Sequence, residues 1–198
     1  MEHVRAKPCP RRLACDFFTT VTVSFRIFYV FVVLEVGTRR IVHWNVTEYP
    51  SEPWILQQFR MILPGDQPHR FVIHDRDTVF SAAVDQLLSD AQLTVLKTPI
   101  RSPQANAYCE RLIGTIRREC LDWVIPLNEP HLRRVLAEWI DHYNRGRPHA
   151  SLGPGLPEAA TNEAPVPSHG HRLPATYRVV VNPVLGGLHH EYRLEAAA

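Results

Sequence analysis

The chain has 198 residues, 45% of them hydrophobic, and a formal net charge of +2 at pH 7. This length and apolar content suffice for one globular domain of ordinary size with extensions. The longest unbroken apolar run, Ile27 to Leu34, is too short to cross a bilayer, and the polar first 15 residues contain no signal-peptide core. Composition therefore argues against a secreted or membrane-spanning protein and favours a cytosolic one.

The basic residues are almost all arginine, with 20 Arg and two Lys among the 22. Arginine presents planar, forked donors that suit phosphate groups. A GC-rich genome produces the same bias, so both interpretations stay open. Arginine pairs recur at 11–12, 39–40, 117–118 and 133–134. The basic charge is therefore spread in doublets and is not concentrated in one tail.

The four cysteines show no C-x-x-C spacing, and the 11 histidines do not complete a zinc signature with them. Thiols of a cytosolic protein stay reduced. We therefore expect reduced, buried side chains at Cys9, Cys15, Cys109 and Cys120.

The first half of the chain is rich in β-branched and aromatic residues, and turn signals separate its apolar runs. This pattern predicts strands near residues 12–20, 26–36 and 40–47. A helix is expected over 51–63, because Ser51 can cap it and Pro53 suits its first turn.

Shorter strands alternate with helices in the rest of the chain. The predicted elements are a strand at 71–74, a helix at 79–90, a strand at 93–97, a long helix at 104–122, a helix at 130–144, and strands at 178–181 and 190–194. This order predicts an α/β fold with a mixed central β-sheet flanked by helices.

The long predicted helix has two distinct faces. An apolar stripe at helical spacing is formed by Cys109, Leu112, Ile113, Ile116 and Cys120. Asn106, Glu110 and Arg117 fall on another face, because residues four or seven apart point in nearly the same direction.

Three carboxylates stand where a carboxylate is unusual unless it binds metal. Asp16 interrupts an apolar strand, Asp75 ends another, and Glu110 lies on the long helix. If the two strands are neighbours, the three would form an oxygen-rich cluster suited to Mg²⁺ or Mn²⁺. Such a cluster should raise the pKa of at least one member, because like charges repel. Asp77 competes with Asp75 as the strand-end ligand.

Four segments together resemble the catalytic core of the retroviral-integrase superfamily, and most closely the transposases of bacterial insertion sequences. Residues 73–80 (Ile-His-Asp-Arg-Asp-Thr-Val-Phe) resemble the family's second-aspartate motif, with an aromatic residue five positions after Asp75. Residues 102–111 (Ser-Pro-Gln-Ala-Asn-Ala-Tyr-Cys-Glu-Arg) resemble the block around the family's glutamate, and residues 117–122 continue it. Residues 142–153 resemble the signature that closes these transposase cores.

The resemblance implies a ribonuclease H-like fold and metal-dependent DNA cleavage and strand transfer during transposition. Carried over by position, Asp16, Asp75 and Glu110 become the catalytic, metal-binding triad for two Mg²⁺ or Mn²⁺ ions. Water or a DNA 3′-hydroxyl would be the nucleophile. The interval between Asp75 and Glu110 and the position of Phe80 favour Asp75 over Asp77.

Four residues of the glutamate block are candidate DNA contacts: Arg117, Asn106, Arg111 and Arg118. A continuous helix would place Arg117 two turns from Glu110, beside the path of DNA bound at the metals. The closing segment also has a structural interpretation, in which Asn144 and Gly146 end a helix and Pro148 prevents its continuation.

The resemblance implies transposon-end and target DNA as partners, together with a second copy or a full-length transposase. It implies no membrane and no small-molecule cofactor. We expect a bacterial cytoplasmic protein that associates with the nucleoid when bound to DNA. The predicted division is an N-terminal extension (1–11), an integrase catalytic core (12–125), a C-terminal helix with the closing motif (126–160), and a Pro/Gly-rich tail with a β-hairpin (161–198).

Relatives usually carry a DNA-end-binding region ahead of the core, so the sequence favours an N-terminally truncated transposase. Two functional hypotheses follow from this. The intact triad favours an active DNA-strand transferase. The missing region favours a non-catalytic remnant that binds DNA or a full-length partner. A plain ribonuclease H-like nuclease fits the block at 102–111 less well.

Overall fold

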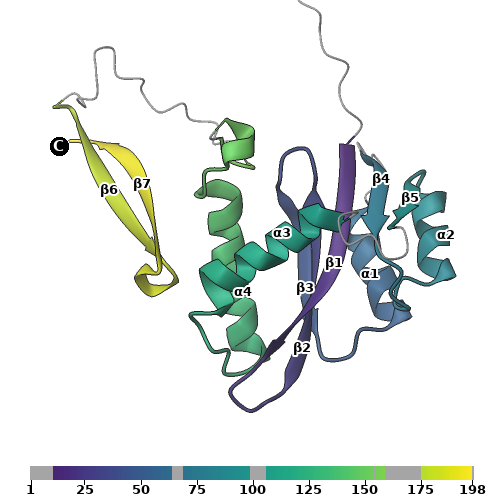
Figure 1. The fold of residues 1–198 in the computed structure, drawn as a ribbon. Helices are drawn as coiled ribbons and strands as arrows, with labels where there is room; N and C mark the ends of the chain where they lie inside the picture. The colour runs from purple at the N-terminus through teal and green to yellow at the C-terminus, as the bar shows by residue number, and fades with distance from the viewer. Residues whose placement is uncertain (1–10, 64–68, 99–105, 154, 159–174, 198) are drawn as a thin grey trace, which may run out of the picture. The chain divides into compact units, whose positions relative to one another are not determined.

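A computed structural model describes residues 11–63, 69–98, 106–153, 155–158 and 175–197 (Figure 1). The chain forms two compact units, Met1–His131 and Leu132–Ala198. No helix within the described ranges is long and apolar enough to cross a membrane. Cys15 and Cys109 are buried free thiols and Cys120 is also buried, as expected, while Cys9 lies outside the described residues.

The first unit is built on a five-stranded sheet with the order β3-β2-β1-β4-β5 (Figure 1). Its strands are β1 (Arg11–Val21), β2 (Ile27–Glu35), β3 (Ile41–Thr47), β4 (His69–His74) and β5 (Thr94–Lys97). The first three strands pair antiparallel, whereas β4 pairs parallel with both β1 and β5. The predicted mixed sheet is therefore confirmed, and the five strands match the sequence pattern closely.

Helices α1 (Glu52–Ile62) and α2 (Ala82–Asp90) bury their apolar sides against one face of the sheet. Phe31 of β2 lies at the centre of this core, with its ring 5.8 Å from that of Phe59 and 5.0 Å from that of Phe17. Because strand side chains alternate between faces, the even-numbered residues of β1 point to the opposite face.

Helix α2 begins three residues later than the sequence pattern predicts. Ser81 takes the N-cap position, and its hydroxyl accepts a hydrogen bond from the Val84 backbone N–H at 3.4 Å. A capping serine has non-helical backbone geometry, so the helix begins at the next residue. At α1, Ser51 occupies the N-cap position without a side-chain capping bond.

The long helix predicted over 104–122 is not continuous. Helix α3 covers Ala107–Ile116 and is followed by a π-helical turn, Arg117–Leu121, in which the Asp122 N–H donates to the Arg117 carbonyl at 2.9 Å. Residues 104 and 105 lie outside the described part. The predicted apolar stripe is buried at four of its five positions: Cys109, Leu112, Ile116 and Cys120.

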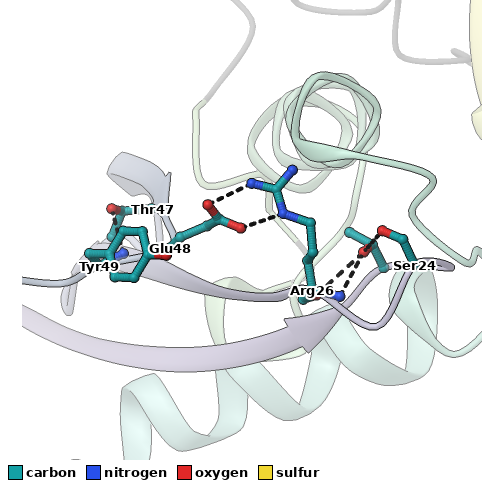
Figure 2. Close-up of polar contacts among 6 residues, drawn as sticks. Ser24, Arg26, Thr47, Glu48 and Tyr49 are labelled. Atoms are coloured by element: carbon teal, nitrogen blue, oxygen red, sulfur yellow. Dashed lines mark hydrogen bonds and ion pairs between the residues drawn. The ribbon is translucent and has the colours of Figure 1, made fainter.

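Charged side chains tie the turn between β1 and β2 to the end of β3 (Figure 2). The Arg26 guanidinium donates two hydrogen bonds of 2.6 Å to the two carboxylate oxygens of Glu48. Within the turn, the Arg26 N–H donates to the Thr22 hydroxyl at 3.2 Å. Phe25 at the tip is 87% exposed and has a φ of 60°, which is uncommon for a bulky residue.

Helix α4 (Glu129–Arg145) leads into the second unit, which ends in a hairpin of β6 (Tyr177–Val184) and β7 (His189–Ala196). The hairpin contains the predicted strand pair, with longer strands. The helix ends at Arg145, as the structural interpretation of the closing segment predicts. Gly146 has no left-handed φ, however, and instead allows close approach of the Glu191 side chain, which accepts a 2.7 Å hydrogen bond from His142.

Candidate active site

Asp16 and Asp75 lie side by side on the face of the sheet that α3 crosses. Strands β1 and β4 pair parallel with Ala14 opposite Ile73, and each aspartate stands two residues further along its own chain. Residues in register on parallel strands project to the same face, and a step of two residues preserves the face. The expectation that the two strands are neighbours is therefore confirmed.

Both carboxylate oxygens of Asp16 are held by neighbours. Oδ1 accepts from the Phe17 N–H at 2.8 Å, and Oδ2 accepts from the Asn106 side-chain amide at 3.4 Å. Burial raises the pKa of Asp16 to about 6, against the opposing effect of the Phe17 hydrogen bond. The negative charges of Asp75, Glu110 and Asp77 add to the increase. A raised pKa in this cluster was expected, but burial is a larger cause than repulsion.

Asp75 and Asp77 both accept hydrogen bonds from the backbone that follows them. One oxygen of Asp75 accepts from the Asp77 N–H at 3.0 Å. The Asp77 carboxylate instead closes the next turn, where it accepts from the Val79 N–H at 3.2 Å and the Thr78 hydroxyl at 3.3 Å. Short polar side chains commonly bond to the backbone two residues on in this way. Both aspartates therefore bond to the backbone two residues on, but Asp75 is the one that continues the register of β4 opposite Asp16, which favours Asp75 as the strand-end ligand.

His74 fixes the backbone at Asp75 from inside the core. Its side chain is fully buried and stacks on Phe80 with 4.5 Å between the ring centroids. One ring nitrogen is 2.6 Å from the Asp75 carbonyl oxygen, and the other is 3.1 Å from the Asp85 carboxylate. Asp85 also forms an ion pair with Lys97. This network is structural, and it anchors the end of β4 to α2 and β5.

Glu110 lies on the exposed side of α3, one residue after Cys109, which is fully buried. The negative charge of Glu110 helps to raise the pKa of Asp16, so the two carboxylates are close enough to interact electrostatically. Across the described ranges, no three His, Cys, Asp or Glu side chains gather closely enough to hold one metal ion. The exposed Glu110 side chain would therefore have to swing toward Asp16 and Asp75 to share an ion with them.

The donor set fits a hard divalent cation in its chemistry. Carboxylates are the preferred ligands of Mg²⁺ and Mn²⁺. Asp75 and Glu110 both raise the pKa of Asp16, and a bound cation would offset that repulsion. Asp16, Asp75 and Glu110 are the residues that would hold such an ion.

The four candidate DNA contacts occupy very different environments. Arg111, Arg117 and Arg118 are exposed. Arg117 donates to the Thr19 carbonyl at 3.1 Å and lies 5.7 Å from the centroid of the Phe18 ring. The Arg118 guanidinium folds back over Gly114. The side chains of Arg117 and Arg118 thus contact other residues of their own unit. Contact of these arginines with DNA stays a prediction.

Asn106 is the exception among the four, because it is only 5% exposed. Its amide nitrogen donates to the Cys15 carbonyl at 3.1 Å in addition to Asp16. Sequence reasoning assigned this residue to the face that binds DNA and missed its contact with β1. The expected helix over 104–122 included Asn106, so no local signal in the sequence indicated this contact.

Comparison with known proteins agrees with this architecture. A family model described as "Integrase core domain" matches residues 91–157. An uncharacterized 31.7 kDa protein of insertion element IS407 from Burkholderia multivorans is 38% identical over 74 residues, which cover 36% of this chain and 26% of that protein. The putative transposase InsD of insertion element IS2E from Escherichia coli is 24% identical over 159 residues, which cover 76% and 72%.

Among solved structures, the catalytic domain of the Mos1 transposase, determined with raltegravir and Mg, matches with a TM-score of 0.57 and 17% identity. That match covers 66% of this chain and 71% of the Mos1 chain. The fold is therefore the ribonuclease H-like fold of integrase and transposase catalytic cores. Residues 91–157 thus match the integrase-core family model, and the chain is similar to insertion-element transposases. It spans about a quarter of the length of the IS407 protein.

Proposed function

We propose that this chain cleaves DNA and transfers DNA strands in transposition, with a divalent metal as cofactor. The observation that carries the proposal is the placement of three carboxylates. Asp16 and Asp75 stand side by side at adjacent parallel strands, and Glu110 acts electrostatically on Asp16 from the helix above them. Members of the integrase-core family with this fold act on DNA, and the site supplies the ligands such an activity requires.

Asp16, Asp75 and Glu110 would hold two Mg²⁺ or Mn²⁺ ions. The catalytic domain of the Mos1 transposase, which shares the fold, was determined with Mg. Two bound ions stabilise the attacking and the leaving oxygen of a phosphoryl transfer. The protein's own part is to keep Asp16 oriented through Phe17 and Asn106, and to keep Glu110 accessible to DNA.

The nucleophile is external to the protein in this proposal. Cys15 and Cys109 directly precede Asp16 and Glu110 in the sequence, but both thiols are fully buried. Burial raises the pKa of each thiol well above its ordinary value, and nearby carboxylates raise it further. A protonated, buried thiol is a poor nucleophile. Water or a DNA 3′-hydroxyl is therefore the attacking group, and no covalent protein–DNA intermediate forms.

We infer that Arg117 contacts a DNA phosphate near the site. Its bond to Thr19 uses one of the five guanidinium donors and fixes the side chain beside β1. Arg111 and Arg118 would add positive charge along the same helix. We also infer that the chain acts in the bacterial cytoplasm, with transposon-end and target DNA and with a second copy or a full-length transposase.

A second candidate function is binding of DNA or of a partner without catalysis. One observation favours it, namely that no three potential ligands in the described residues already surround a single point. The two candidates differ in a single property, which is whether metal draws Glu110 toward the two aspartates.

The test is Mg²⁺- or Mn²⁺-dependent nicking of a DNA substrate by the full chain. Glu110→Gln should remove activity while preserving the fold, because a neutral amide is a much poorer ligand for a hard cation. Glu52→Gln, at an exposed position on α1, is the matched control and should keep activity. Activity of Glu110→Gln equal to that of the wild type would exclude the triad. Metal-independent DNA binding without nicking would favour the second candidate.

A further inference from the structure

We propose that Asn106 is a positioning residue, which orients the Asp16 carboxylate for metal binding and does not contact DNA. The inference rests on the proposed function, because it assigns a role in that site. Asn106, the residue directly before α3, contacts Asp16 in the middle of β1, 90 residues away in sequence.

Asn106 stands at the N-cap position of α3 but does not cap the helix. Asparagine is favoured at such positions because its side-chain oxygen accepts a hydrogen bond from a backbone N–H of the first turn. In α3 no such bond forms. The Asn106 side chain instead reaches β1, and it also forms a hydrogen bond with the Cys109 thiol that lowers the pKa of that thiol.

The contacts of Asn106 define which way its amide faces. Its Nδ2 donates to the Cys15 carbonyl and to Asp16 Oδ2, at 3.1 and 3.4 Å. Both partners are acceptors, so the opposite orientation would place oxygen against oxygen. The Oδ1 atom is buried and finds no hydrogen-bond partner among the residues that the structure describes. An unpartnered buried oxygen is unfavourable, so the hydrogen bonds donated by Nδ2 are the contacts that account for this orientation of the amide.

The effect of these contacts is to fix the plane of the Asp16 carboxylate. Oδ1 is held by the Phe17 N–H and Oδ2 by Asn106, yet each oxygen has a second lone pair for a cation. A neutral amide orients the carboxylate without neutralising it, whereas an arginine or lysine at this position would compete with the metal. Groups that orient metal ligands in this way commonly change metal affinity 10–100-fold when replaced.

The experiment compares two asparagines that precede helices. Asn128 stands before α4, and its Oδ1 accepts from the His131 N–H at 2.9 Å, so it makes the capping bond that Asn106 lacks. Serine caps helices about as well as asparagine but cannot reproduce the amide donors. Mn²⁺ affinity of the full chain is measured by calorimetry for Asn106→Ser and Asn128→Ser, with circular dichroism to verify folding.

Asn106→Ser should weaken Mn²⁺ binding about 10–100-fold with helix content preserved, and Asn128→Ser should bind as the wild type does. Equal Mn²⁺ affinity of Asn106→Ser and the wild type would overturn the positioning role and leave the proposed function standing. If the wild type does not bind Mn²⁺, or binds it no better than Glu110→Gln does, the proposed function itself fails.

A second measurement requires no substitution at Asn106. In the folded wild type, the side-chain amide protons of Asn106 should shift in the NMR spectrum on addition of Mg²⁺, because their acceptor Asp16 becomes a ligand. The Asn128 amide should not shift. An Asn106 amide that is insensitive to Mg²⁺, in a chain that binds Mg²⁺, contradicts the inference even if Asn106→Ser fails to fold.

Discussion

Replacing Asp16 with asparagine should make the protein more stable relative to the wild type as the pH rises, while it removes activity. The structure raises the pKa of Asp16 from its ordinary 3.8 to about 6, mainly by burial. The folded state therefore holds the Asp16 proton more tightly than the unfolded state does. The resulting stabilisation is complete below pH 3.8 and is lost as the pH rises through about 6. Above that pH, the wild type keeps a buried carboxylate that the asparagine variant lacks.

The magnitude follows from the size of the shift. A difference of about two pKa units, at 1.36 kcal/mol per unit, corresponds to about 3 kcal/mol of unfolding free energy. The difference in stability between Asp16→Asn and the wild type should thus grow by up to about 3 kcal/mol from pH 4 to pH 8, on top of a constant offset from the altered hydrogen bonds. Using the difference between the two proteins cancels the titration of groups that do not interact with Asp16.

The assay is urea unfolding of both proteins at several pH values without metal, and again with Mg²⁺. With Mg²⁺ at pH 8, the wild type should regain stability and Asp16→Asn should not, because a bound cation favours the ionised carboxylate. A stability difference that stays constant between pH 4 and pH 8 would refute the reasoning, since Asp16 would then titrate normally in the folded state.

Three further predictions test other parts of the structure. Arg117→Ala should weaken DNA binding equally for all sequences. It should also lower the slope of log affinity against log salt concentration by about one, as measured by binding at several salt concentrations. An unchanged slope counts against a phosphate contact. Gly146→Ala places a Cβ 2.0 Å from Glu191 Oε1. It should lower the free energy of unfolding by about 1–2 kcal/mol, measured by thermal or urea unfolding. The control is Gly37→Ala, whose Cβ meets nothing within 4 Å and which should not lower the free energy of unfolding. Equal effects of the two glycine substitutions would contradict the Glu191 contact. Phe25→Asn should raise the unfolding free energy by up to about 1 kcal/mol, because asparagine tolerates the positive φ that Phe25 adopts at the exposed tip of its turn. A lower unfolding free energy would mean that the contacts of the Phe25 ring stabilise the fold by more than the backbone strain costs.

The sequence by itself determined the order and kind of the elements around the site. Apolar runs and β-branched residues predicted all five strands of the sheet, because hydrophobic periodicity is a local property. It also singled out Asp16, Asp75 and Glu110, because a carboxylate within or beside an apolar element is unusual and the surrounding motifs are those of a known family. Local turn chemistry was less visible, so the start of α2 at Ala82 was missed.

Only the tertiary structure decided which elements meet. The side-by-side placement of Asp16 and Asp75 depends on pairing between β1 and β4, which are separated by two strands and a helix in sequence. The contact of Asn106 with Asp16 has the same origin, because it joins the residue before α3 to a strand 90 residues earlier in the chain. The sequence likewise indicated Gly146 as a residue that ends a helix. In the structure, its lack of a side chain allows the Glu191 side chain, 45 residues further along the chain, to approach closely. Local propensities fix what a segment becomes, whereas contacts between distant segments are set by the packing of the whole core.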